Sequence, residues 1–197
     1  MAQTAEQEAE GYVREALRAL GFDMQSEGMR GTPGRWVRAL QDMTANRDRG
    51  DTDAARLLRV DFDGGCYDEV VAVAGMPFTS LCEHHLLPVI GRASIAYLPS
   101  EDAQGRSRVV GLSKLPRLVE LYARRPQLQE RMTVQIGDAL EKHLCPRATG
   151  VLIEASHACM SCRGVRSAGV MRTEYLRGTF RDLPHARAEA MERMRMP

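Results

Sequence analysis

The 197-residue chain has few aromatic residues, two lysines and no long apolar run. Aromatic residues make up 5% of the sequence, and because Lys114 and Lys142 are the only lysines, arginine supplies almost all of the positive charge. The 27 basic residues are balanced by 26 acidic residues, which leaves a formal net charge of +1. A chain without a strong net charge does not attract nucleic acid or an anionic membrane as a whole, so we expect neither as a partner.

The sequence also lacks the signals of a secreted or membrane protein. No stretch approaches the roughly 18 consecutive apolar residues of a membrane-spanning helix, and the first eight residues form neither a basic nor an apolar leader region. Five cysteines at irregular spacings do not form the framework of a disulfide-rich secreted domain. We therefore expect a cytoplasmic protein in which clustered cysteine and histidine serve metal binding or catalysis.

Thiol, carboxylate and imidazole groups are concentrated in one short stretch, residues 82–85, which reads Cys-Glu-His-His. Cys82 and His85 are three residues apart, a spacing that lets one tight turn place a thiolate and an imidazole on the same cation. Sulfur together with nitrogen favours zinc. A second stretch, about 75 residues later, contains His157 and Cys159 and supplies the nearest further ligands.

This second stretch predicts a strand over residues 150–159, on which His157 and Cys159 share one face about 7 Å apart. With Cys159 as the third protein ligand, a zinc ion keeps a fourth position for water and lowers the pKa of that water toward about 7, as in catalytic sites. Cys162 leaves alternatives open: a fourth ligand of a closed structural site, half of a redox pair with Cys159, or a small buried side chain.

Hydrophobic periodicity outlines the secondary structure. The predicted helices span residues 6–20, 32–43, a short piece ending at 58, 115–122, 126–140 and 184–196. The predicted strands span residues 69–74, 89–97, 150–159 and 170–179, and a polar, hairpin-like or irregular surface loop spans 101–108. This order favours an α+β fold with an antiparallel sheet. We expect an N-terminal helical region over residues 1–65 and a second domain over residues 66–197.

The start of the predicted helix at 115–122 has the features of an anion site. Ser113 can cap the helix, and its free N–H groups, together with Lys114 and Arg117, would suit a phosphate chain. The alternative is a capped helix with two solvated charges. Glu130 and Arg35 each read, on their own, as ordinary helix charges.

Four segments resemble GTP cyclohydrolase I, in the same order along the chain: residues 78–85, 111–115, 125–131 and 157–164. The resemblance extends from about residue 76 to residue 180. It implies the tunnelling fold, an antiparallel four-stranded sheet with a helix pair in the order ββααββ, preceded here by N-terminal helices. It also implies that five such sheets join into a barrel and that two pentameric barrels stack into a homodecamer, with active sites between subunits.

The resemblance assigns a role to each candidate residue. The zinc ligands would be Cys82, His85 and Cys159, and the catalytic imidazoles would be His84 and His157. The residues that would bind GTP are Arg35, Ser113, Lys114, Arg117, Gln129, Glu130 and Arg163. Arg35 would reach in from a neighbouring subunit, and the serine, the lysine and the other arginines would surround the triphosphate and ribose.

The family's reaction opens the imidazole ring of the guanine of GTP by hydrolysis, releases formate and recloses to 7,8-dihydroneopterin triphosphate, for pterin and tetrahydrofolate biosynthesis. The resemblance implies that His157 protonates N7, which makes C8 electrophilic, and that His84 serves later proton transfers. Glu130, with Gln129 beside it, would accept hydrogen bonds from N1–H and the 2-amino group, a pairing that rejects adenine.

The chain departs from the family pattern after residue 164, where Met171, Arg172 and Glu174 replace small hydroxyl residues. One alternative is therefore a diverged paralogue that opens GTP for a deazapurine or a specialised pterin product. A non-catalytic assembly module with a closed four-ligand zinc site is another, but it leaves the two catalytic histidines unexplained. A reductase is not favoured, because no glycine-rich dinucleotide turn follows a strand.

Overall fold

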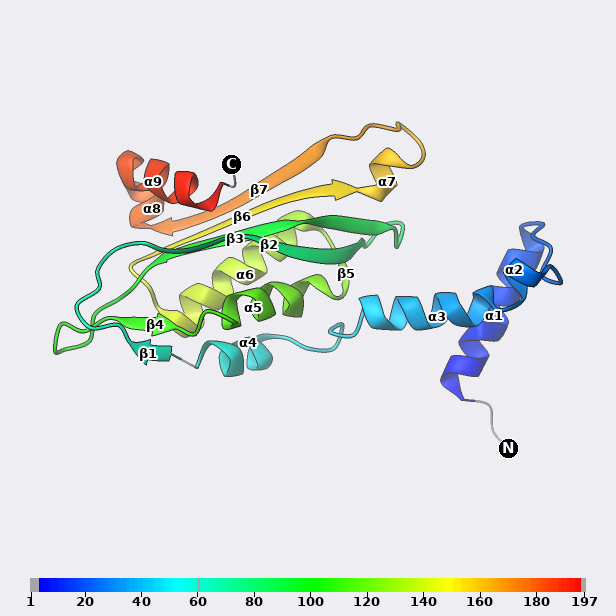
Figure 1. Cartoon of the computed structure of the whole chain (residues 1–197), viewed down its shortest axis with the longest axis horizontal. Helices are drawn as coiled ribbons and strands as arrows, with labels where there is room; N and C mark the ends of the chain where they lie inside the picture. The colour runs from blue at the N-terminus through cyan, green and yellow to red at the C-terminus, as the bar shows by residue number, and fades with distance from the viewer. Residues whose placement is uncertain (1–3, 60, 196–197) are drawn as a thin grey trace. The chain divides into compact units, whose positions relative to one another are not determined.

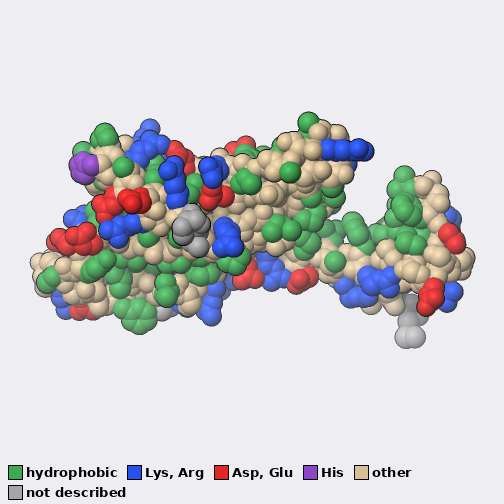
Figure 2. Space-filling model, turned by 45° about the horizontal axis from the view of Figure 1, so that its top comes forward, with side chains coloured by type: hydrophobic (Ala, Val, Ile, Leu, Met, Phe, Trp, Pro, Cys, Tyr) green, Lys and Arg blue, Asp and Glu red, His purple; other side chains and the backbone are tan. Residues whose placement is uncertain are grey.

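The computed structural model describes residues 4–59 and 61–195. The chain divides into two compact units, Met1–Ala45 and Asn46–Pro197. Within the described ranges, no helix is both long and apolar enough to cross a bilayer. On the face drawn in Figure 2, basic and acidic side chains are interspersed, so this face carries no broad area of one charge sign.

The N-terminal unit is helical. Its helices are α1 (Ala5–Ala19), α2 (Glu27–Arg30) and α3 (Thr32–Met43). A capping box begins α1, because the Thr4 hydroxyl accepts from the N–H of Gln7 while the Gln7 side chain accepts from the N–H of Thr4. The predicted helices at 6–20 and 32–43 are confirmed, but Thr32 is the first residue of α3 and not its cap, and its hydroxyl donates to the carbonyl of Gly28.

The second unit is an α+β domain, as predicted. Its helices are α4 (Asp51–Leu58), α5 (Lys114–Ala123), α6 (Gln129–Leu144), α7 (Ala158–Ser161), α8 (Thr179–Asp182) and α9 (Pro184–Met194). Its strands are β1 (Asp61–Asp63), β2 (Val71–Cys82), β3 (Pro88–Leu98), β4 (Arg108–Val110), β5 (Pro126–Gln127), β6 (Ala148–His157) and β7 (Val170–Gly178). The main sheet has the order β5-β2-β3-β6-β7 and is antiparallel except for the short β2–β5 pair.

Helices cover both faces of this sheet (Figure 1). On one face α5 and α6 bury side chains such as Leu118 and Ile136 against Ile95 and Ile153 of the central strands. On the other face α8 and α9 pack against the residues that alternate with these, among them Leu152. The central strands β3 and β6 are therefore largely buried on both faces, which accounts for their nearly continuous apolar runs. Together with the helices they bury a core large enough for an independent domain.

Two predicted boundaries are wrong near the site. Pro126 does not open a helix, because Pro126 and Gln127 form β5 and pair in parallel with Leu81 and Cys82, so α6 begins only at Gln129. The first strand of the sheet is also longer than the predicted 69–74, since β2 runs on to Cys82. The sequence motif that carries Cys82 is therefore the end of a strand and not a separate loop.

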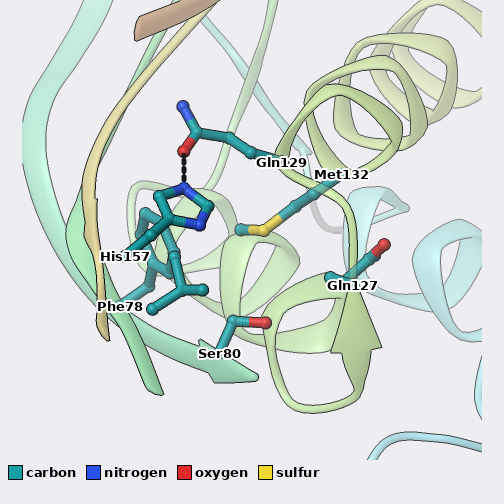
Figure 3. A pocket seen from close by; sticks show the side chains of 7 residues that line it. Phe78, Ser80, Gln127, Gln129, Met132 and His157 are labelled. Atoms are coloured by element: carbon teal, nitrogen blue, oxygen red, sulfur yellow. Dashed lines mark hydrogen bonds between the residues drawn. The ribbon is translucent and has the colours of Figure 1, made fainter. Parts of the chain in front are cut away.

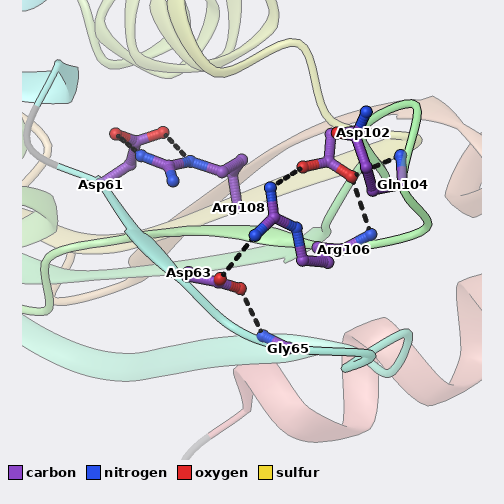
Figure 4. Close-up of polar contacts among 7 residues, drawn as sticks. All are labelled: Asp61, Asp63, Gly65, Asp102, Gln104, Arg106 and Arg108. Carbon is purple, nitrogen blue, oxygen red and sulfur yellow. Dashed lines mark hydrogen bonds and ion pairs between the residues drawn. The ribbon is translucent and has the colours of Figure 1, made fainter.

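The polar segment 101–108, for which we expected a hairpin-like or irregular surface loop, forms a hairpin that is held to β1 (Figure 4). The carboxylate of Asp102 accepts the backbone N–H groups of Gln104 and Arg106, and the Arg106 guanidinium contacts both Asp102 and Asp63. The side chain of Arg108 meets Asp61 on the paired strand β1 through two hydrogen bonds of 2.8 and 2.9 Å.

Candidate metal and substrate site

The candidate residues gather at one end of the main sheet. Strand β2 ends at Cys82, β3 begins after the following turn, and β6 ends at His157, opposite Val89 of β3. The short strand β5 lies beside the end of β2 and leads directly into α6. Sheet register thus brings the two Cys/His stretches together across 75 residues of sequence, and places the start of α6 beside them.

Cys82, His85 and Cys159 form a cluster in which the three ligand atoms lie within 4.8 Å of one another. The Sγ of Cys82 is 4.0 Å from Nδ1 of His85. Tetrahedral zinc with bonds of about 2.3 Å to sulfur and about 2.0 Å to nitrogen needs its ligand atoms roughly 3.5–3.8 Å apart, so this cluster fits such an ion with small adjustments. Two thiolates and one imidazole are also the donor types that zinc prefers.

A tight turn presents Cys82 and His85 to the same point. The N–H of Leu86 donates to the carbonyl of Cys82 at 2.8 Å, and Leu86 adopts a positive φ of 51°. The N–H of Cys82 in turn donates to the carbonyl of Leu87 at 2.9 Å, which closes the turn. The predicted role of the C-x-x-H spacing is therefore matched by the backbone.

Cys159 reaches the cluster from a helix and not from a strand. We expected residues 150–159 to be extended, but β6 ends at His157 and α7 begins at Ala158, with the N–H of Cys162 donating to the carbonyl of Ala158. The predicted alternation of His157 and Cys159 on one strand face is thus wrong. Burial, and then contact with Cys82, raise the pKa of the Cys159 thiol, whereas Cys162 is exposed and outside the cluster.

His157 and Gln129 are brought together at the sheet end. The Nε2 of His157 lies 2.8 Å from Oε1 of Gln129, the first residue of α6 (Figure 3). A small pocket between the sheet and α6 is lined by these two side chains and by Phe78, Ser80, Val89, Gln127 and Met132. Partial burial lowers the pKa of His157, and the nearby charge of Glu130 acts in the opposite direction.

The other two candidates beside the cluster are exposed. The ring of His84 stands edge-on to that of His85, with centroids 6.2 Å apart, so it borders the cluster without belonging to it. Glu130 lies in the first turn of α6, immediately after buried Gln129, and faces solvent. Both are accessible to a ligand that approaches the sheet end.

The predicted anion residues occupy the start of α5. Ser113 is at the N-cap position, but its side chain makes no capping hydrogen bond, so its hydroxyl remains available to a ligand. Lys114 is the first helical residue, and Arg117 follows one turn later with an exposed side chain. The helix has ten residues, and its first turn contains no acidic residue. The partial positive charge of its N-terminal N–H groups and the charges of Lys114 and Arg117 therefore have the same sign.

Two predicted residues lie outside these elements. Arg163 is exposed in the segment that follows α7. Arg35 belongs to the N-terminal unit, where its Nη2 donates to the carbonyl of Gly28 at 2.7 Å and to the hydroxyl of Thr32 at 3.0 Å.

The sequence interpretation missed Arg131. Its guanidinium makes two hydrogen bonds to the carboxylate of Glu83, and this contact lowers the pKa of Glu83. Glu83 follows Cys82 and Arg131 follows Glu130, so the pair joins the turn over residues 82–86 to the start of α6. Arg131 stands in the segment 125–131 that carried the family resemblance, but an exposed arginine in a helix offers no pattern that identifies its partner.

Comparison with known proteins agrees with this geometry. The family model of GTP cyclohydrolase I matches residues 9–195. The GTP cyclohydrolase 1 of Mycobacterium bovis is 46% identical over 188 residues, which cover 95% of this chain and 89% of that protein, and the enzyme of the same name from Streptomyces avermitilis is 46% identical over 187 residues, which cover 94% and 89%. The crystal structure of apo archaeosine synthase QueF-Like aligns with a TM-score of 0.45 at 14% identity, over 57% of this chain and 96% of that one. The family model and the two relatives at 46% identity show that the chain belongs to the GTP cyclohydrolase I family.

Proposed function

We propose that this chain is a zinc-dependent enzyme that opens the guanine imidazole ring of GTP by hydrolysis, releases formate and forms 7,8-dihydroneopterin triphosphate. The observation that carries the proposal is the cluster of Cys82, His85 and Cys159 at the sheet end, in a chain of this family. Among the residues that the structure describes, the cluster has three candidate ligands and not four, and a three-ligand zinc site is the kind that keeps a position open for chemistry. This favours the enzyme over a closed structural site.

The three proposed ligands differ in burial. Cys82 is buried at the end of β2, Cys159 is partly buried in α7, and His85 is exposed, so the cluster opens to solvent on the His85 side. A bound zinc ion supplies Lewis acidity and lowers the pKa of a coordinated water. It also favours the thiolate form of both cysteines. This would oppose the rise in the pKa of Cys159 that burial causes.

The two histidines beside the ligands carry the proton transfers. His157 precedes Cys159 by two residues and is held by Gln129, so we assign it the proton that goes to N7 of guanine. Protonation of N7 withdraws electrons from C8 and makes water addition there feasible near neutral pH. His84, exposed beside His85, is assigned the later transfers during ring opening and reclosure.

Glu130 selects the base. Its carboxylate lies in the first turn of α6, beside His157, and accepts the N1–H and 2-amino hydrogens that guanine offers and adenine lacks. A carboxylate that faces adenine would be left with an unpaired charge, which disfavours adenine strongly.

The triphosphate and ribose are bound by the start of α5 and by arginine. At the N-terminus of α5, the Ser113 hydroxyl offers a neutral donor, and Lys114 and Arg117 offer cationic donors. Arg163 adds a third cation from the segment after α7. We assign Arg35 to the site of a neighbouring subunit.

Assembly follows the tunnelling-fold arrangement in this proposal, with a catalytic domain over residues 66–197, a preceding helical region over 1–65, and pentameric barrels stacked into a decamer in the cytoplasm. One feature of the sheet supports contact between copies. Ile90 of β3 and Val170 of β7 flank Ser156 of β6 in the same row, and they are 61% and 58% exposed. Exposed apolar side chains at the end of the sheet that carries the candidate site suit burial by another subunit.

The proposal is tested by incubating the purified, zinc-loaded chain with GTP. We expect stoichiometric formate and, after mild oxidation, a fluorescent pterin, with ATP giving neither product. Formate without a pterin would indicate that the ring opens but does not reclose, and absence of both from a zinc-loaded oligomer would refute the proposal.

A further inference from the structure

Gln129 is buried, with 5% of its surface exposed, and its side-chain amide is fully engaged within the protein. Its Nε2 lies 3.1 Å from the carbonyl oxygen of Ile153 in β6 and 3.1 Å from that of Met171 in β7. The hydroxyl of Thr173 is also 3.1 Å away. The Oε1 faces Nε2 of His157 at 2.8 Å. A side chain held in this way has no N–H group left to direct at a nucleobase, and its buried oxygen is directed at His157.

The surroundings fix which end of the amide is the nitrogen. Reversing the amide would set its oxygen against the two carbonyl oxygens of Ile153 and Met171, which accept hydrogen bonds and cannot donate them. An unpaired buried acceptor of this kind costs about 1–3 kcal/mol. The amide nitrogen therefore faces the strands, and the oxygen of Gln129 faces His157.

A chain of hydroxyl groups adds a second constraint. Thr133, one turn after Gln129 in α6, donates its only hydroxyl hydrogen to the carbonyl of Gln129 at 2.7 Å. In the 2.7 Å contact between Thr133 and Thr173, the donor is therefore Thr173. The oxygen of Thr173 can then only accept from Gln129, which gives the amide nitrogen a third acceptor and holds the side chain between α6 and β7.

These constraints determine the proton on the histidine. Oε1 of Gln129 is an acceptor without a hydrogen, so the 2.8 Å contact requires a hydrogen on Nε2 of His157. A neutral imidazole has only one N–H, and Nδ1 then carries the lone pair. In Figure 3 the ring is held through Nε2 alone by the amide, with its other nitrogen turned away from Gln129.

We propose that Gln129 is a positioning residue, held by Ile153, Met171 and Thr173, that keeps His157 in the Nε2–H tautomer and leaves Nδ1 as the atom that exchanges protons. The role of Nδ1 in catalysis rests on the proposed function, whereas the tautomer follows from the hydrogen bonds of Gln129. This positioning role replaces the guanine-binding role that the family resemblance implied for Gln129 and leaves base recognition to Glu130. It also explains why a glutamine, with both a donor and an acceptor end, stands between two carbonyls and an imidazole.

The tautomer is tested directly by ¹⁵N NMR of the zinc-loaded protein labelled in its five histidines, without substrate. The signal of His157 is assigned by its loss in His157→Ala. At a pH at which His157 is neutral, we expect a protonated Nε2 and an unprotonated Nδ1 in the parent, and a mixture of tautomers in Gln129→Met. A parent signal with the hydrogen on Nδ1 would overturn the proposal whether or not the chain acts on GTP.

Kinetics separate positioning from base binding. For Gln129→Met we expect kcat for GTP to fall roughly tenfold to a hundredfold, part of the usual contribution of a general acid, with KM changed by less than about twofold. A raised KM with an unchanged kcat would mean that Gln129 binds guanine after all. Failure of the parent itself to open GTP would refute the proposed function and leave the tautomer result standing.

Thr173 provides a matched pair of variants should Gln129→Met fail to fold. Thr173→Val removes the hydroxyl at nearly constant volume, whereas Thr173→Ser retains it. We expect the valine variant to show a smaller loss of kcat and a partly mixed His157 tautomer, and the serine variant to match the parent in both. Equal behaviour of the two variants would show that the hydroxyl does not hold the amide, and would contradict the proposed network.

Discussion

Glu83 and Arg131 form a two-point ion pair that connects the turn over residues 82–86 to the first turn of α6. Nη1 and Nη2 of Arg131 donate to the two carboxylate oxygens of Glu83, the second bond being 3.2 Å long. The backbone adds to this connection, because the N–H of Glu83 donates to the carbonyl of Gln127 at 3.0 Å. Cys82 and His85 on one side are thereby held in register with Glu130 on the other.

We predict that Arg131→Met lowers kcat for GTP about threefold to tenfold while changing stability little. Both side chains of the pair are about 40% exposed, and exposed ion pairs contribute at most about 1 kcal/mol to folding. A catalytic site is more sensitive than the fold, since small displacements of reacting groups reduce the rate strongly. Steady-state kinetics and urea denaturation of the same preparation measure the two effects.

The exchanged pair, Glu83→Arg with Arg131→Glu, should recover part of the lost rate. Arg187→Met serves as the control, because Arg187 pairs with Glu174 at similar exposure and touches none of the proposed site residues. If Arg187→Met and Arg131→Met reduce kcat equally, the Glu83–Arg131 pair has no particular role at the site.

Loss of any one proposed ligand should release the metal. We predict that Cys82→Ser, His85→Ala and Cys159→Ser each reduce bound zinc well below one ion per chain and abolish turnover, because a three-ligand site that loses a ligand holds its ion poorly. Cys162→Ser should retain both, since Cys162 lies outside the cluster. Metal analysis after gel filtration measures the content, and zinc loss in the Cys162 variant would contradict the ligand assignment.

The clustering of Cys82, His85 and Cys159 could be predicted from the sequence, although the backbone expected at Cys159 was wrong. The spacing of Cys82 and His85 is a local property, and a tight turn realises it as expected. The strand predicted over residues 150–159 includes Cys159, whereas the chain turns into α7 one residue earlier, at Ala158. Residue types therefore identified which side chains cluster, while the local backbone depended on contacts that a single sequence does not display.

The hydrogen-bond network of Gln129 could not be predicted for a similar reason. Its partners Ile153, Met171 and Thr173 stand 24 to 44 residues away and are brought to it by the pairing of β6 with β7. Two of the three contacts use backbone carbonyls, which every residue possesses. By contrast, the helix pair and the four long strands were predictable, because their periodicity is contained within each segment.

Glu130→Gln should retain zinc and assembly but lose most activity on GTP. The amide presents one acceptor and one donor, whereas the N1–H and 2-amino groups of guanine offer two donors, so one contact becomes repulsive. We expect kcat/KM to fall by roughly 10²- to 10³-fold, which corresponds to a few kcal/mol. Values of kcat/KM within about threefold of the parent would show that Glu130 is only a surface charge near the start of α6.

The hydroxyl of Tyr175 should make the stability of the fold depend on pH in the alkaline range. Its ring packs on Gly137 of α6, where a Cβ would lie 2.4 Å from the ring, and its hydroxyl donates to Asp138 at 2.9 Å. Burial, and then the contact with Asp138, raise the pKa of Tyr175 to about 12 from an ordinary value of 10.0. In the unfolded chain the phenol ionises near 10, so its contribution to stability is complete below that pH and is lost as the pH rises toward 12.

Tyr175→Phe should therefore destabilise the fold at pH 8 by about 1 kcal/mol, through loss of the hydrogen bond to Asp138. This difference should shrink as the pH rises above 10, because only the parent loses stability through this phenol, by at most about 1.4 kcal/mol per pH unit. Urea denaturation at pH 8, 9, 10 and 11 measures the trend. A Tyr175→Phe difference that does not narrow between pH 10 and 11 would show that the phenol of Tyr175 ionises equally well in the folded protein.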